Sequence, residues 1–172
     1  MTSDFLEVWK AFRSYEEHEN ALINHRISWF VTMQSVLIAT FGFSIQKYFE
    51  VMAKIAETSD PKHILTVISN INSRYQTYLF VLCVIGFVVA YWANTGVKTA
   101  ITAQTEMRNM FSLKHLKSLE ESGLPDISGG GDRWAKEQGA TFARWLPLAA
   151  EGLWIFVAVG TLISTAGFSI IG

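Results

Sequence analysis

The sequence ISWFVTMQSVLIATFGFSIQ, residues 27–46, contains neither Lys nor Arg. Two further stretches share this property, at 75–97 and 152–172. Each is close to the ~20 residues that an α-helix needs to cross a hydrocarbon core of ~30 Å. The sequence therefore predicts an all-α integral membrane protein with about three transmembrane helices.

The composition agrees with this prediction and excludes several other classes. Half of the chain is hydrophobic and 17% is charged, against roughly 25% charged residues in soluble domains. A net charge of −1 gives no basic field, so direct nucleic-acid binding is not expected. The single cysteine, Cys83, excludes a disulfide within one chain. No Cys/His cluster has metal-ligand spacing, and we expect no metal and no cofactor.

Local signals divide the chain into six segments. Apolar side chains recur at three- and four-residue steps after Ser3, which is typical of an amphipathic helix. Asp60-Pro61 predicts a helix start, and Ser122-Gly123-Leu124-Pro125 predicts a helix stop. The acidic N-terminal segment does not resemble a signal peptide. The predicted order is an N-terminal amphipathic cytoplasmic helix at 1–26, a first span at 27–49, an extracytoplasmic helical hairpin at 50–74, a second span at 75–97, a cytoplasmic helical segment at 98–144 with a loop at 122–132, and a third span at 145–172.

Basic and aromatic residues predict the orientation. Ten of the 14 Lys and Arg residues lie in 1–26 and 98–144, and four lie in 47–74. The positive-inside rule then places the N-terminus in the cytoplasm and the C-terminus outside, in a bacterial inner membrane. Two interfacial aromatic belts fit this orientation. The inner belt consists of Trp29, Tyr91, Trp92 and Trp145, and the outer belt of Tyr48, Phe49, Tyr75 and Tyr78.

The most distinctive pattern is a stripe of small and polar residues along the first span. Four- and three-residue steps place its members on one helix face: Ser28, Thr32, Ser35, Ala39, Gly42 and Gln46. Lipid is a poor environment for these side chains, because they lose hydrogen-bond partners in hydrocarbon. One interpretation is close packing against other helices. The alternative is that several copies surround an axis and the stripe lines a water-filled path.

Small residues on the other two spans indicate further helix contacts. They are Cys83, Gly86, Ala90 and Ala93 on the second span, and Gly152, Gly160, Ser164 and Gly167 on the third. So many contact faces in a short chain favour several helix partners and a homo-oligomer within the membrane lipid.

Three ionisable residues are candidates for gating or proton sensing. Glu151 lies close to membrane depth, where carboxylates are costly and often functional; alternatively it sits at headgroup level. His18 and His25 are seven residues apart, roughly 10 Å along a helix. Around a symmetry axis each could form a ring or a proton-sensitive constriction. The alternative is a solvated or packing role.

Arg108-Asn109 and His115 fit the loose Arg-x(4 to 6)-His pattern of HEPN ribonucleases, and Arg13 with His18 fits it too. In its general layout the chain resembles pore-forming membrane accessories of RNA-targeting phage defence in bacteria. That resemblance rests on 108–115 and implies a membrane-perturbing effector, with no catalytic residue carried over. Independently, the basic segment 98–144 is a candidate surface for a soluble cytoplasmic partner, with Arg108, Lys114, His115 and Lys117 as contact residues.

We therefore expect an oligomeric membrane channel or pore and no enzyme activity. The first alternative is a membrane anchor or accessory subunit that conducts nothing and recruits a soluble partner through 98–144. The second alternative is a membrane-bound HEPN-like ribonuclease.

Overall fold

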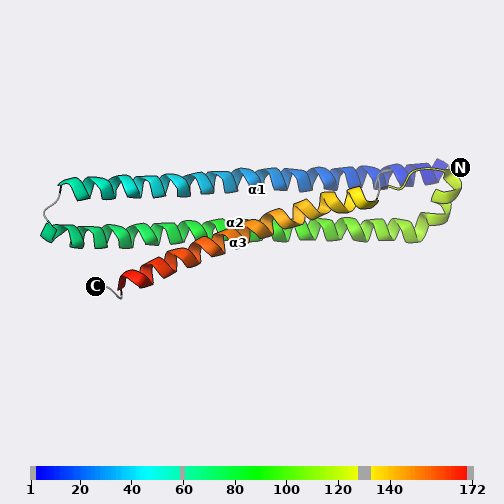
Figure 1. The fold of residues 1–172 in the computed structure, drawn as a ribbon. Coiled ribbons are helices and arrows are strands. Elements are labelled where there is room, and N and C mark those ends of the chain that lie inside the picture. The colour runs from blue at the N-terminus through cyan, green and yellow to red at the C-terminus, as the bar shows by residue number, and fades with distance from the viewer. Residues whose placement is uncertain (1–2, 59–60, 128–132, 170–172) are drawn as a thin grey trace. The chain divides into compact units, whose positions relative to one another are not determined.

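The computed structural model describes residues 3–58, 61–127 and 133–169. These residues form three helices, α1 (Ser3–Thr58), α2 (Pro61–Ser122) and α3 (Arg133–Ser169), as Figure 1 shows. No strand occurs in the described ranges. The prediction of an all-α chain is confirmed for this part of the protein.

The helix ends follow from local sequence. No Gly or Pro interrupts α1 before Gly42, so its amphipathic beginning runs without a break into the apolar stretch. Helix α2 begins at Pro61, where a missing N–H costs nothing. It is followed by Gly123 with a φ of 66°, the left-handed conformation that glycine adopts after a helix. Asp132 directly precedes α3 and is of a residue type that often caps helices, but it lies outside the described residues.

Among the described residues, three helices are long and apolar enough to cross a membrane, over Asp4–Glu57, Val67–His115 and Thr141–Ile163. With 56 and 62 residues, α1 and α2 greatly exceed the ~20 residues that one crossing requires. A large part of each must therefore lie outside the hydrocarbon core if either crosses it.

The chain forms two compact units, and each helix contributes to both. Unit 1 comprises Met1–Trp29 and Trp92–Pro147, and unit 2 comprises Phe30–Tyr91 and Leu148–Gly172. The three boundaries between the units along the chain coincide with the expected inner aromatic belt. Trp29 lies at the first boundary, Tyr91 and Trp92 lie at the second, and Trp145 lies two residues before the last residue of unit 1 at the third. All four of these aromatic side chains are exposed. Unit 1 also contains the ten basic residues counted for the cytoplasmic side, and unit 2 contains the other four.

Unit 1 combines an apolar core with polar contacts. The core is formed by Ile23, Ile27, Val97, Ala100, Ile101 and Ala143. Around it, Gln104 Nε2 donates to Asn20 Oδ1 at 3.1 Å, and Trp9 Nε1 donates to the carbonyl of Pro125 at 3.0 Å. The second of these bonds ties the segment after α2 to the first turns of α1.

Unit 2 packs through the small residues of the second span. Cys83, Gly86 and Ala90 are buried, and Ala93, in unit 1, is half-buried. Gly152 and Gly160 differ, because both are exposed and a Cβ at either would meet no atom within 4 Å. These two glycines therefore do not pack within the chain. Ser164 and Gly167 belong to α3, and the exposure of both residues lies outside what the structure describes.

Candidate functional site

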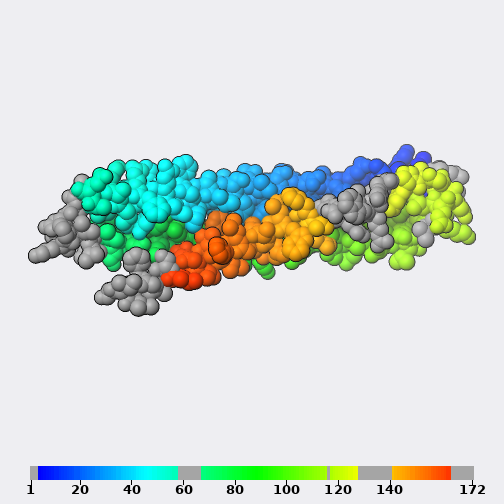
Figure 2. All heavy atoms as spheres, in the orientation of Figure 1, coloured from blue at the N-terminus to red at the C-terminus, as the bar shows by residue number. Residues whose placement is uncertain are grey.

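All six residues of the α1 stripe lie at the surface of the chain. Ser28, Thr32, Ser35, Ala39, Gly42 and Gln46 are each exposed. Figure 2 shows atoms of α1, in blue and cyan, at the surface along the helix. Ser35 Oγ donates to the carbonyl of Val31 at 2.8 Å, within its own helix. The stripe therefore does not form the contact between the helices of one chain.

The opposite side of α1 forms that contact. At 100° per residue, Phe30 and Gln34 lie on the far side of the helix from the stripe, and both are buried. Gln34 Oε1 accepts a hydrogen bond from Trp154 Nε1 at 2.7 Å. Its Nε2 donates to the carbonyl of Gly86 at 3.3 Å. One amide side chain thus joins all three helices inside unit 2.

Neither Gln34 nor Trp154 stands out in the sequence, because a single Gln or Trp in an apolar span has no distinctive pattern. A usable signal is the spacing of seven and then four residues from Ile23 through Phe30 to Gln34. Such spacing is typical of the seam between supercoiled helices. Gly86 is part of this contact because the indole ring of Trp154 occupies the space that a Cβ at residue 86 would fill.

The candidate gating residues are divided between the two units. His18 and His25 are exposed on α1 in unit 1. Glu151 is half-buried on α3 in unit 2 and has an interaction partner.

Arg108 is part of a polar contact inside unit 1. Its Nε donates to Glu16 Oε1 at 3.0 Å, and its Nη2 contacts the same oxygen. The carboxylate is buried, whereas the guanidinium is partly exposed. This arrangement gives Arg108 a structural partner, and the sequence provides no signal that Glu16 is the buried member of its acidic stretch.

The remaining residues of the expected partner surface differ in exposure. Lys114 and Lys117 are exposed. The His115 ring lies between aromatic neighbours, with centroids 5.9 Å from Phe5 and 5.2 Å from Phe111. Arg13 pairs with Glu17 at 3.1 Å. Both Arg-x(4 to 6)-His matches therefore have their arginines in ion pairs.

No family model, curated protein or solved structure matches the chain. Among the described residues, no group of three or more His, Cys, Asp or Glu side chains is placed to hold a metal ion. The two arrangements with a chemical consequence are the exposed stripe on α1 and the polar contacts that hold the helices on its other side.

Proposed function

We propose that the protein is an oligomeric channel or pore of a bacterial inner membrane, with the α1 stripe facing a central water-filled path. One observation carries this proposal: all six stripe residues are exposed in the single chain. In a membrane, the polar amide of Gln46 would then be turned toward lipid, which is unfavourable, whereas Ser35 already donates to a carbonyl of its own helix. When several copies of the chain surround an axis, the stripe faces the central water-filled path and no longer faces lipid.

Exposed glycines support self-association. A small residue at a helix surface lets a neighbouring membrane helix approach closely. Gly42, Gly152 and Gly160 are all exposed, and a Cβ at any of them would meet no atom within 4 Å. These positions have room for a helix from another copy.

The two units fit a division between membrane and cytoplasm. Between Phe30 and Tyr91, unit 2 carries charged residues only at 47–74, and its second segment, Leu148–Gly172, carries only Glu151. Unit 1 carries ten basic residues. By the positive-inside rule, unit 1 with the N-terminus is cytoplasmic and the C-terminus is extracytoplasmic. In this proposal unit 1 receives the signal that opens the path, and the protein acts as a membrane-perturbing effector.

The experiment is dye and ion leakage from liposomes that contain the purified protein. We expect Ser35→Leu to reduce leakage at least about tenfold, because a leucine in a polar constriction excludes water. Val36→Leu is the matched control, since Val36 is the next residue and is also exposed but lies off the stripe. Leakage that survives Ser35→Leu, or is lost equally in Val36→Leu, contradicts the proposal.

A second candidate is a non-conducting anchor that recruits a soluble partner, and a groove in unit 1 favours it. The groove has a volume of about 400 Å³, and Phe12, Tyr15, Met107 and Met110 line it. Nearby in sequence, Leu113 is 87% exposed. Exposed apolar groups of this kind mark protein contact sites. If the protein is an anchor, liposomes that contain it should not leak, and a soluble partner should co-purify with it. Met110→Glu should abolish this co-purification.

A further inference from the structure

Arg26 joins α1 to α2 close to the point where unit 1 ends on α1. The residue is exposed, and its Nη1 donates to the carbonyl of Gly96 on α2 at 3.2 Å. This bond uses one of the five N–H donors of an arginine. The other donors are thereby held beside α2, in the planar arrangement that binds a phosphate through two parallel hydrogen bonds.

Two tryptophans lie one helical turn beyond this bond, one on each helix. The helices run antiparallel in unit 1, as three hydrogen bonds show. These bonds join residue 16 to 108, residue 20 to 104 and residue 26 to 96. In this register Trp29 lies at the level of Trp92, and each is three or four residues from the bond, on the same face of its helix. Both tryptophans are exposed, and the sequence beyond them in each helix is uncharged as far as Lys47 and Arg74.

No carboxylate on these two helices lies near Arg26. The closest acidic residue on α1 is Glu19, seven residues or roughly 10 Å along the helix. Helix α2 has no acidic residue before Glu106, whereas Lys98 is exposed two residues after Gly96. Within the described ranges, neither Arg26 nor Lys98 belongs to an ion pair. The positive charge at this level therefore favours an anionic ligand.

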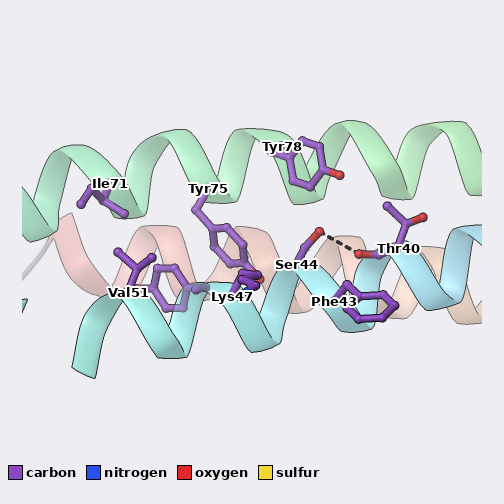
Figure 3. A pocket seen from close by; sticks show the side chains of 9 residues that line it. Thr40, Phe43, Ser44, Lys47, Val51, Ile71, Tyr75 and Tyr78 are labelled. Atoms are coloured by element: carbon purple, nitrogen blue, oxygen red, sulfur yellow. Dashed lines mark hydrogen bonds between the residues drawn. The ribbon is translucent and has the colours of Figure 1, made fainter. Parts of the chain in front are cut away.

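The other end of the uncharged stretch of α1 differs in its charges. Lys47 is the first charged residue there, and with Tyr75 it lines a cavity of about 590 Å³ between α1 and α2 in unit 2, which Figure 3 shows. Lys47 Nζ lies 2.6 Å from Glu50 Oε2, so this cation already has a carboxylate partner. Arg26 and Lys47 therefore flank the same stretch as an unpaired and a paired cation, and Lys47 provides a matched control.

We propose that Arg26, Trp29 and Trp92 bind one anionic glycerophospholipid of the cytoplasmic leaflet, with its phosphate on the guanidinium and its glycerol region at the level of the indole rings. Tryptophan favours this level of a membrane, because its ring is apolar and its N–H is polar. Gly96 leaves open space beside the guanidinium, since a Cβ there would meet no atom within 4 Å.

This inference rests on the proposed membrane insertion and orientation but not on conduction. Ser35→Leu, which is expected to stop leakage, should leave lipid binding unchanged. Loss of lipid binding at Arg26 should in turn leave the particle mass in detergent unchanged. The lipid site and the channel can therefore fail separately.

The test is a lipid titration of the delipidated protein in detergent, with phosphatidylglycerol or phosphatidylcholine of the same acyl chains. Native mass spectrometry gives the dissociation constant of the first lipid bound, and thermal unfolding gives the stabilisation. We expect phosphatidylglycerol to bind more tightly than phosphatidylcholine. Arg26→Gln should weaken phosphatidylglycerol binding about fivefold, from the loss of one cation at the phosphate. Lys47→Gln should leave this binding nearly unchanged, because Lys47 is paired with Glu50.

Gly96→Leu separates binding from folding. Without lipid, this variant should unfold at the same or a higher temperature than the parent protein, because a Cβ has room there and leucine is the better helix former. With phosphatidylglycerol, it should lose most of the stabilisation that the parent protein gains, because the leucine side chain fills the space beside Arg26. Equal losses in Arg26→Gln and Lys47→Gln, phosphatidylcholine binding as tight as phosphatidylglycerol, or an unchanged lipid response in Gly96→Leu would each overturn the proposal.

Discussion

At Gly86 the backbone of α2 lies directly against the indole ring of Trp154. A Cβ added there would lie 2.6 Å from Trp154 Nε1 and closer to two ring carbons. The ring has little room to move, because Trp154 is 2% exposed and its N–H is bonded to Gln34. The absence of a side chain at this position is therefore a condition for joining α2 and α3 in unit 2.

Gly86→Ala is expected to destabilise the protein, although alanine is the better helix former. Overpacking of this kind costs about 1–3 kcal/mol, which should lower the unfolding temperature in detergent. Gly96→Ala is the control, because a Cβ there meets no atom within 4 Å; its unfolding temperature should stay the same or rise. Equal unfolding temperatures for the two variants would show that Trp154 does not constrain Gly86.

Helices α1 and α2 are joined in unit 1 by the Glu16–Arg108 contact. The Glu16 carboxylate is almost fully buried, and Oε2 has no hydrogen-bond partner in the described part of the chain. Most of its stabilisation must therefore come through Oε1 and Arg108. The contact therefore holds α1 and α2 in one register, since a buried charge is poorly tolerated without its partner.

Glu16→Gln is expected to lower the free energy of unfolding by about 1.5–3 kcal/mol, the range for hydrogen bonds to charged groups. Chemical denaturation in detergent measures this change. Glu17→Gln is the matched control one residue later: Glu17 pairs with Arg13 on the surface, where such a pair contributes at most about 0.5 kcal/mol. Similar losses of unfolding free energy in both variants would mean that the buried Glu16–Arg108 contact stabilises the protein no more than a surface ion pair does.

At the scale of the helices, much could be predicted from the sequence. Three uncharged stretches identify three long apolar helices, and Pro61 and Gly123 stand where α2 starts and just after it stops. The packing face was harder to find. Residues at three- and four-residue steps occur on both sides of α1, and hydroxyl-bearing small residues suit either protein contact or water. The sequence therefore marks the stripe as unusual but does not show that Phe30 and Gln34 form the buried side.

The contacts made by Glu16, Gln34 and Trp154 were not predictable for a different reason. Their importance depends on partners 92 and 120 residues away in the chain, and single-residue patterns contain no information about such pairs. The opposite holds for Cys83, Gly86 and Ala90, since small residues at regular spacing already indicate a face for close helix contact. Arg108 was found, but as a partner-binding candidate, because a basic residue on a helix gives no sign of a buried carboxylate beside it.

For the whole molecule, the decisive quantity is the number of chains per particle. Three helices are too few to enclose an aqueous path, so the proposed channel requires several copies around an axis. Light scattering of the purified protein in detergent should give a protein mass several times that of one chain. A monomeric particle would remove the channel proposal and leave the anchor.

Gly42 lies at one edge of the stripe at about 100° per residue, and Gly42→Leu tests whether neighbouring copies meet there, beside the path that the rest of the stripe lines. Within one chain, a Cβ at Gly42 meets no atom within 4 Å, and leucine is a better helix former than glycine by roughly 1 kcal/mol, so the folded chain accommodates the change. Only a neighbouring copy would collide with the new side chain. The variant is therefore expected to lose particle mass while keeping its helix content by circular dichroism. Val36→Leu, on an exposed position off the stripe, should retain the parent mass. An unchanged mass in Gly42→Leu would place the contact between copies on another face, with the exposed Gly152 and Gly160 of α3 as the next positions to substitute.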